Sequence, residues 1–252
     1  MHRFFLTPER ALAETLTLSE EESHHAANVL RVRAGELATV LDGLGTEYRG
    51  VIEHVAKRAV TVRVRERVQH SARPVELSLA IALLKGRAWD AVLEKATELG
   101  VTRIQPLEAE RSIVRFKVGE AAMKLVGWRA TTIAAAKQCG TPWLPHVLSP
   151  LPPEAWLRSV GPAGSVPELL LVASLESGAG SIRTAVAEFA ARRGRRPISA
   201  AVVVGPEGDF TAAEYAAFWR AGAVPFTLGP LVLRADTAVV AALAVAGAEL
   251  SE

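Results

Sequence analysis

Cysteine is nearly missing from the sequence, with Cys139 the single example among 252 residues. One cysteine excludes an internal disulfide and a zinc site built from several cysteines. The sequence also lacks an uninterrupted apolar run of about 18 residues, and it does not begin with a basic stretch followed by an apolar one. A transmembrane helix and a secretory signal are therefore not predicted, and we expect a cytoplasmic protein with no membrane partner.

An excess of charge of one sign is missing as well, since 29 lysines and arginines stand against 27 acidic residues. This balance argues against a protein that coats nucleic acid by bulk charge, but local basic patches remain able to bind an RNA or DNA site. Two phosphate-binding glycine loops are also lacking, G-x-x-x-x-G-K-[ST] and G-x-G-x-x-G opening a helix after a strand. A nucleoside triphosphate or a dinucleotide is therefore a poor candidate ligand.

What the sequence does have, at 50% hydrophobic residues, is the composition of a globular protein. Ser19 and Glu22 have the spacing of a capping box, and the apolar positions that follow predict a short helix over 20–32. Short alternating segments from 37 to 66, separated by GLGT and AKRA, predict antiparallel strands joined by tight turns. The first 72 residues are therefore expected to form a small β-rich module.

The last of these strands has two different faces. Val60, Val62 and Val64 fall on one side, and the arginines at 63, 65 and 67 fall on the other, because strand side chains alternate. Two interpretations stay open for this arginine face. It is either ordinary solvated surface or a stripe, including Arg63 and Arg65, that contacts RNA phosphates.

From residue 73 onward, apolar segments alternate with helical patterns, which is typical of a three-layer α/β domain with a parallel sheet. Because the pattern changes at this point, we divide the chain near Ala72 into domains 1–72 and 73–252. Within the second domain, the composition of 161–168, GPAGSVPE, predicts a loop. The expected strands lie within 75–84, 101–107, 168–175, 198–205 and 223–229, and the expected helices within 88–100, 119–138 and 185–193, with two more from 211 and from about 236.

Two glycine-proline turns follow successive strands near the end of the chain. The first, residues 205–208, leads into a helix on which Thr211 and Glu214 have capping-box spacing, and the second begins at Gly229. Ligands of open α/β sheets bind at the carboxyl ends of strands. Gly205 and Gly208 allow positive φ angles and let a ligand approach the backbone without a Cβ atom in the way. The two turns therefore predict two walls of one pocket.

Seven motifs follow one another along the chain: MHRFF at 1–5, HHAANVLRVRAGE at 24–36, KGRAWDAVLEKATELGVTRIQPL at 85–107, ERS at 110–112, AAAKQCG at 134–140, VGPEGDFTAAE at 204–214 and LGPLVLRADTA at 228–238. In this order they resemble the ribosomal RNA small subunit methyltransferase E family, whose members methylate N3 of a uridine in 16S ribosomal RNA. The resemblance implies a PUA-like β-barrel followed by a SPOUT α/β domain with a trefoil knot. It also implies S-adenosylmethionine as cofactor, and a homodimer with the last helix at or near the two-fold interface.

The same resemblance implies which residues bind the cofactor and the RNA. The substrate would be 16S ribosomal RNA or the assembled small ribosomal subunit. The expected cofactor residues are Ser174, Leu175, Gly205, Pro206, Glu207, Gly208, Leu228, Gly229, Leu233 and Arg234. The expected RNA-binding residues of the N-terminal module are Arg3, His25, Arg31 and Arg33, beside which stand Arg63 and Arg65 of the strand described above.

Three residues are candidates for the chemistry. Uracil N3 carries a proton at neutral pH, so a cation near the uracil oxygens would stabilise the charge left behind, and Arg234 is the first candidate. Its alternative role is a salt bridge. Glu207 or Asp236 would take the proton, although either could instead cap backbone groups, Asp236 as a helix N-cap. No metal is expected, because adjacent histidines on a helix such as His24 and His25 diverge by about 100°.

The sequence departs from the family pattern at five positions. The family often has arginine at Leu231, glutamate at Asp236, glycine at Asp209, glutamate at Lys137 and arginine at Thr141. Two rival functions stay open. One is a knotted methyltransferase acting on tRNA, and the other is a non-catalytic RNA-binding protein of the same fold.

Overall fold

The computed structural model describes residues 1–11, 13–116, 119–160, 167–176 and 178–251, so the loop expected at 161–168 lies largely outside the described residues. The chain divides into two compact units. Unit 1 comprises Met1–Ala72 together with Ile133–Leu144, and unit 2 comprises Arg73–Thr132 together with Pro145–Glu252. Each unit has hydrophobic clusters of its own, one in unit 1 and two in unit 2.

Unit 1 is built on a five-stranded sheet in the order β1-β3-β4-β5-β2. The antiparallel pairing of β3 with β4 and of β4 with β5 confirms the prediction from the alternating segments. The sheet is nevertheless mixed, because β1 lies parallel to β3, and neither β1 nor β2 was expected. The strands are β1 (His2–Phe5), β2 (Thr15–Thr17), β3 (Leu37–Leu41), β4 (Thr46–Ala56) and β5 (Ala59–Gln69), with a 3-10 helix η1 (Pro8–Arg10) after β1.

The helix expected over 20–32 is shorter and less regular than predicted. An α-helix α1 (Glu20–His24) passes into a π-helix η2 (His25–Leu30). The Ser19 side chain accepts a hydrogen bond from the Glu22 N–H, as the capping-box spacing predicts. The helix ends because Arg31 adopts a left-handed conformation with φ of +53°.

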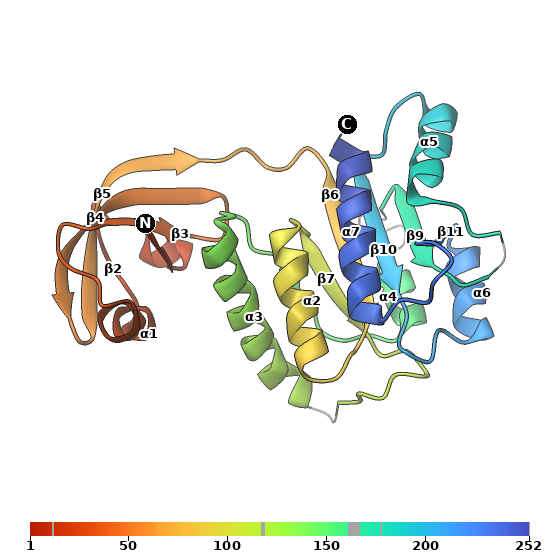
Figure 1. The fold of residues 1–252 in the computed structure, drawn as a ribbon, viewed down its shortest axis with the longest axis horizontal. Coiled ribbons are helices and arrows are strands. Elements are labelled where there is room, and N and C mark those ends of the chain that lie inside the picture. The colour runs from red at the N-terminus through yellow and green to blue at the C-terminus, as the bar shows by residue number, and fades with distance from the viewer. Residues whose placement is uncertain (12, 117–118, 161–166, 177, 252) are drawn as a thin grey trace. The chain divides into compact units, whose positions relative to one another are not determined.

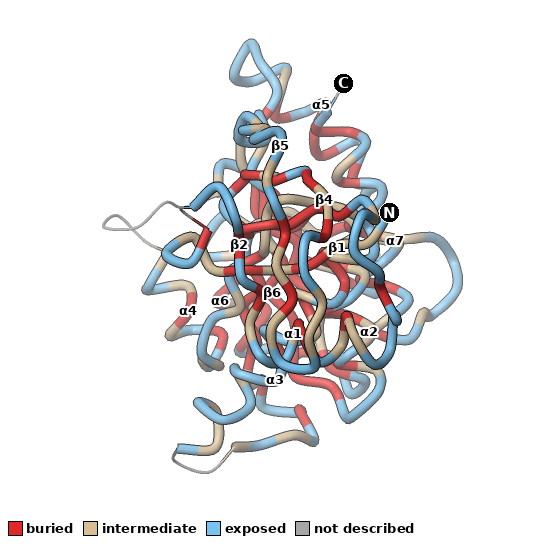
Figure 2. The backbone as a smooth tube through the Cα atoms, turned by 90° about the vertical axis from the view of Figure 1, so that its left-hand side faces the viewer, coloured by how far each residue is buried: buried red, intermediate tan, exposed pale blue. Residues whose placement is uncertain are grey.

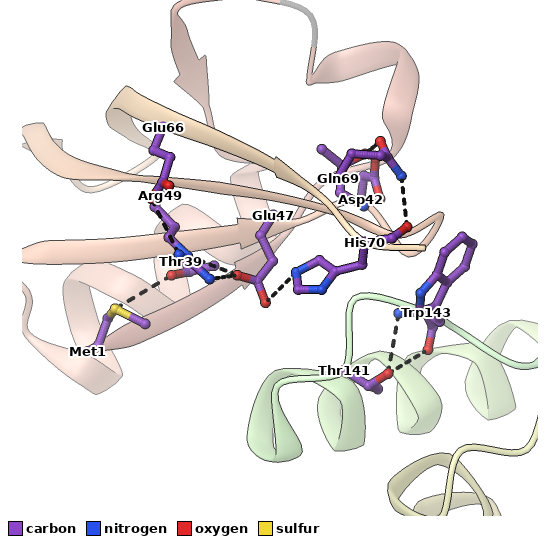
Figure 3. A network of polar contacts seen from close by, with 11 residues as sticks. Met1, Thr39, Asp42, Glu47, Arg49, Glu66, Gln69, His70, Thr141 and Trp143 are labelled. Atoms are coloured by element: carbon purple, nitrogen blue, oxygen red, sulfur yellow. Dashed lines mark hydrogen bonds and ion pairs between the residues drawn. The ribbon is translucent and has the colours of Figure 1, made fainter. Parts of the chain in front are cut away.

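A polar network holds the turns of unit 1 (Figure 3). The Asp42 carboxylate accepts hydrogen bonds from two turn N–H groups, of Leu44 at 2.8 Å and of Thr46 at 2.9 Å. Gly45, with φ of +97°, lies under the Trp143 ring, which a Cβ atom at this position would meet at 2.2 Å. Only glycine therefore fits where residues 141–144 pack on the turn before β4.

Unit 2 contains a six-stranded sheet in the order β11-β9-β10-β6-β7-β8, and every pairing within it is parallel. This confirms the parallel α/β fold predicted from the strand and helix alternation. The two-residue strand β8 was not expected, because so short a segment has no periodicity to recognise. The strands are β6 (Glu76–Ala82), β7 (Arg103–Leu107), β8 (His146–Val147), β9 (Leu169–Ala173), β10 (Ser199–Val204) and β11 (Val224–Phe226).

Helices cover both faces of this sheet (Figure 1). Residues of α2 (Arg87–Glu98), α5 (Ile182–Arg193) and α7 (Ala235–Ser251) share one hydrophobic cluster with the sheet. Residues of α4 (Pro153–Ser159) and α6 (Ala212–Arg220) share the other. Buried residues, red in Figure 2, therefore follow the strands and the inward sides of the helices.

Three tryptophans of unit 2 pack against other aromatic rings or lie in the core, with Trp219 partly buried. Trp89 of α2 and Trp128 of α3 (Glu120–Cys139) are buried with ring centroids 5.0 Å apart. Trp219 stacks on Tyr215 at 5.4 Å. Within the described residues, no helix is both long and apolar enough to cross a membrane. The trefoil knot stays a prediction.

Candidate functional site

A cavity of about 310 Å³ opens in unit 2 at the carboxyl ends of three neighbouring strands, β9, β10 and β11. Its lining comes from the turn after each strand and from the beginning of α7, as the two glycine-proline turns led us to expect. Of the ten residues expected at a cofactor, the structure does not place Gly208 and Gly229 in the lining. The eight that do line the cavity are Ser174, Leu175, Gly205, Pro206, Glu207, Leu228, Leu233 and Arg234.

The turn after β10 has its positive φ at a residue other than glycine. Neither Gly205 nor Gly208 uses the positive φ that glycine allows. The residue in the left-handed region is Asp209, with φ of +61°. The glycines matter for space instead, because a Cβ atom at Gly205 would lie 3.2 Å from the Phe210 ring and one at Gly208 would lie 3.3 Å from the Arg111 Cβ.

Asp209 is held in its conformation by two hydrogen bonds. Its Oδ1 accepts from the Phe210 N–H at 2.8 Å and from the Tyr215 hydroxyl at 2.7 Å. Burial of the hydroxyl, followed by the hydrogen bond to the Asp209 carboxylate, raises the pKa of Tyr215 well above its usual range. Tyr215 therefore stays protonated and acts as a donor. Its hydroxyl also lies 3.2 Å from the Ala173 carbonyl oxygen, at the end of β9.

The loop after β7 is docked on this turn, which the sequence did not indicate. The Arg111 guanidinium donates to the Gly208 carbonyl at 2.9 Å, and the Glu110 N–H donates to Glu214 Oε1 at 2.8 Å. Glu214 Oε2 accepts from the Thr211 N–H, which completes the predicted capping box of α6. The only signal in the sequence was the ERS motif at 110–112, to which no role could be assigned from spacing alone.

Replacing Glu214 by alanine should lower the free energy of unfolding by about 2 kcal/mol, because two N–H groups lose their acceptor at a buried carboxylate. Urea denaturation measures this loss. Glu154→Ala is the matched control, since Glu154 lies exposed on α4 and pairs with Arg158 at 3.8 Å. An exposed pair of this kind contributes at most about 1 kcal/mol. Equal stability of the two variants would contradict the structural role given to Glu214.

The third wall of the cavity is formed by the turn that follows β11 and leads into α7. The Ser174 N–H donates to the Phe226 carbonyl at 2.9 Å, which ties the turn after β9 to β11. Gly229 has φ of +117°, a conformation suited to glycine, and its N–H lies 3.3 Å from the Thr227 hydroxyl. The turn therefore keeps a fixed shape although Gly229 itself lies outside the lining.

Charged groups stand at the edge of the cavity. Arg234 is exposed, and its guanidinium forms no hydrogen bond or ion pair with any described residue. Glu207 is exposed and also lines the cavity. Asp236 does not line it, and its Oδ1 accepts from the Thr237 N–H at 2.9 Å. The expected N-cap role of Asp236 is wrong, because α7 begins one residue earlier, at Ala235.

The residues expected to bind RNA differ in whether their side chains already have partners within unit 1. Arg3 donates to the carbonyl oxygens of Lys137 and Gln138, and Arg63 pairs with Glu53. These two arginines already have partners in the chain itself. Among the other four, Arg31, Arg33 and Arg65 are exposed and His25 is partly buried, and the RNA-binding role of all six residues stays a prediction.

The lining suits a cofactor that has both apolar and polar parts. The volume of the cavity lies at the small end of the range typical of ligand sites, about 300–1,000 Å³. Sequence reasoning missed its apolar base, which an aromatic ring or ribose could contact. The missed lining residues are Ala173, Val204, Asp209, Phe226, Thr227, Leu231, Val232, Ala235 and Ala238. The described residues contain no group of three or more His, Cys, Asp or Glu that could hold a metal ion.

Comparison with known proteins covers both parts of the chain. The RNA methyltransferase domain family matches residues 71–247, and the RNA methyltransferase PUA domain family matches residues 18–65. The ribosomal RNA small subunit methyltransferase E of Synechocystis sp. is 31% identical, over 96% of this chain and 76% of that protein. The protein of the same name from Bacillus subtilis is 28% identical, over 96% and 94%.

Solved structures agree with these matches. The fold is similar to the crystal structure of a ribosomal RNA small subunit methyltransferase E from Neisseria gonorrhoeae bound to S-adenosyl methionine, with a TM-score of 0.82 and 31% identity. The similarity covers 97% of this chain and 96% of that one.

Proposed function

The chain belongs to the ribosomal RNA small subunit methyltransferase E family, and from this premise we propose that it methylates N3 of a uridine in 16S ribosomal RNA with S-adenosylmethionine as cofactor. The observation that carries the proposal is the cavity at the ends of β9, β10 and β11, formed by the turns that the family motifs occupy. Its rigid main-chain turns and apolar base suit a nucleoside cofactor.

When bound, S-adenosylmethionine supplies an electrophilic methyl group on a positively charged sulfur. The chain's own task is to hold the uracil base in line with that group and to exclude water. Leu175, Leu231 and Val232 contribute apolar surface to the cavity, with exposed fractions of 64%, 75% and 76%. These side chains are available to cover a base placed at the opening.

We assign the removal of the N3 proton to Glu207 rather than Asp236. Glu207 lines the cavity, whereas the Asp236 carboxylate is outside it and accepts a backbone hydrogen bond. The Glu207 carboxylate would take the N3 proton and leave an electron pair on N3 for the methyl carbon, whose bond to the cofactor sulfur would break with its electron pair staying on sulfur. The Arg234 guanidinium, which has no partner among the described residues, would donate to a uracil oxygen and stabilise the negative charge as the proton leaves.

Mass mapping of small-subunit RNA after incubation with the protein and methyl donor tests the proposal. The expected product is one methyl group on a uridine of 16S ribosomal RNA. Parallel incubations should contain free 16S ribosomal RNA, assembled subunits and tRNA. Methylation of tRNA alone would favour a knotted methyltransferase that acts on tRNA. Calorimetry that detects no heat of binding at saturating S-adenosylmethionine would favour a non-catalytic RNA-binding protein. Ribosomal RNA as substrate implies that the protein acts in the cytoplasm.

We also propose that the active unit is a homodimer with α7 at the two-fold interface. Exposed apolar side chains support this, with Val240 and Val245 on α7 exposed by 37% and 41%, beside Leu231 and Val232 in the preceding turn. Light scattering should give the mass of two chains. Val232→Asp should shift the measured mass toward that of one chain. Ile198→Asp should not shift it, because Ile198 is an exposed residue just before the start of β10, at the end of that strand away from the cavity. A wild-type mass of one chain would contradict the dimer.

A further inference from the structure

The turn after β10 carries an acidic residue in a conformation that few side chains adopt. Asp209 has φ of +61°, and residues other than glycine keep such an angle where surrounding contacts hold them. The contacts are the hydrogen bonds to Oδ1 from the Phe210 N–H and the Tyr215 hydroxyl. Strained residues of this kind occur disproportionately at functional sites, and Asp209 lines the cavity.

Only one oxygen of this carboxylate is used within the chain. Oδ1 accepts both hydrogen bonds, and Oδ2 accepts none from the described residues. Because Tyr215 donates to Oδ1 and stays protonated, the carboxylate has a fixed orientation. Any occupant that displaces water from Oδ2 must offer a positive charge or a donor, since a desolvated carboxylate without a partner is costly.

The charges of the lining point to a cationic occupant. Its acidic residues are Glu207 and Asp209, and Arg234 is the one cation among the described residues that line it. Arg234 forms no ion pair with either carboxylate in the part of the chain that the structure describes. The lining therefore carries one negative charge in excess, and the negative charge of Asp209 is not neutralised from inside the chain.

Resting on the proposed function, we propose that Asp209 determines the specificity of the cofactor site for the charged methyl donor over the spent cofactor. Its carboxylate recognises the positive charge that S-adenosylmethionine carries at sulfur and that S-adenosylhomocysteine, the product of methyl transfer, lacks. The two molecules share their adenine, ribose and amino-acid groups and differ only in the methyl group and the positive charge that it gives the sulfur, and a carboxylate responds to the charge. The site thus holds the donor and releases the product.

Titration calorimetry of the full chain, without RNA, tests this with both ligands. Asp209→Asn removes the charge but keeps an oxygen that can accept both hydrogen bonds, and asparagine tolerates a positive φ. We expect its dissociation constant for S-adenosylmethionine to rise about tenfold, while that for S-adenosylhomocysteine stays within about twofold. Glu188→Gln, the same charge change on the exposed side of α5, should alter neither constant.

Asp209→Gly provides a second variant, since glycine accepts the positive φ without any contact. It should show the same selective loss of donor affinity. An equal loss for both ligands would overturn the inference, because the carboxylate would then contact a group that they share, and so would unchanged affinities for both. Wild-type protein that binds neither ligand would instead overturn the proposed function.

Discussion

Arg234→Ala should lower the rate constant of RNA methylation about 10²–10³-fold, the usual loss when a fixed donor to a developing negative charge is removed. The guanidinium stands at the cavity with no partner among the described residues, so its truncation leaves no group of the chain unpaired. The fold should therefore persist. Single-turnover methylation with saturating donor and 16S ribosomal RNA measures the rate of the chemical step directly.

The control for this variant is Arg192→Ala. Arg192 lies exposed near the end of α5, and among the described residues its side chain donates only to the Glu188 carbonyl of its own helix. It should methylate at the wild-type rate. Calorimetry with S-adenosylmethionine on the Arg234 variant separates chemistry from cofactor binding, since a residue acting on the uracil should change affinity far less than rate. Full turnover by Arg234→Ala would remove it from the catalytic residues.

The position of the cavity follows partly from sequence. The apolar runs at 168–175, 198–205 and 223–229 predicted three strands, and each strand ends at the turn that was expected to bind a ligand. Their order in the sheet could not be predicted. Strand β9 lies between β11 and β10, and this arrangement brings the three turns together. Pairing between parallel strands depends on the long crossovers that join them, which leave no pattern in the strands themselves.

Contacts between residues far apart in the sequence could not be predicted either, because they depend on the order of the strands in the sheet. Arg111 and Gly208 are separated by 97 residues, and their hydrogen bond depends on β7 and β10 lying in one sheet. The backbone of the turn after β10 also departs from the usual preference for glycine at a positive φ. Gly205 and Gly208 would allow a positive φ, but the residue that adopts one is Asp209, whose carboxylate accepts two hydrogen bonds there. A local hydrogen bond outweighed the conformational preference.

Phe226→Ala should lower the free energy of unfolding of unit 2 by about 3–5 kcal/mol, because the ring is fully buried at the end of β11 and the substitution leaves a cavity. Denaturant unfolding measures this effect. The same ring lines the candidate cofactor cavity, so the variant should also lose affinity for S-adenosylmethionine. Stability loss alone does not identify a cofactor wall, and a second buried ring is needed for comparison.

Phe189 of α5 provides that comparison, since it is buried in the same hydrophobic cluster but does not line the cavity. Phe189→Ala should lose similar stability and keep its affinity for the methyl donor, as measured by calorimetry well below the melting temperature of both variants. The difference between the two affinities isolates the contact with the cofactor, because the loss of core packing is common to both. Equal affinities would mean that β11 contributes only to the core and that the cofactor is bound elsewhere.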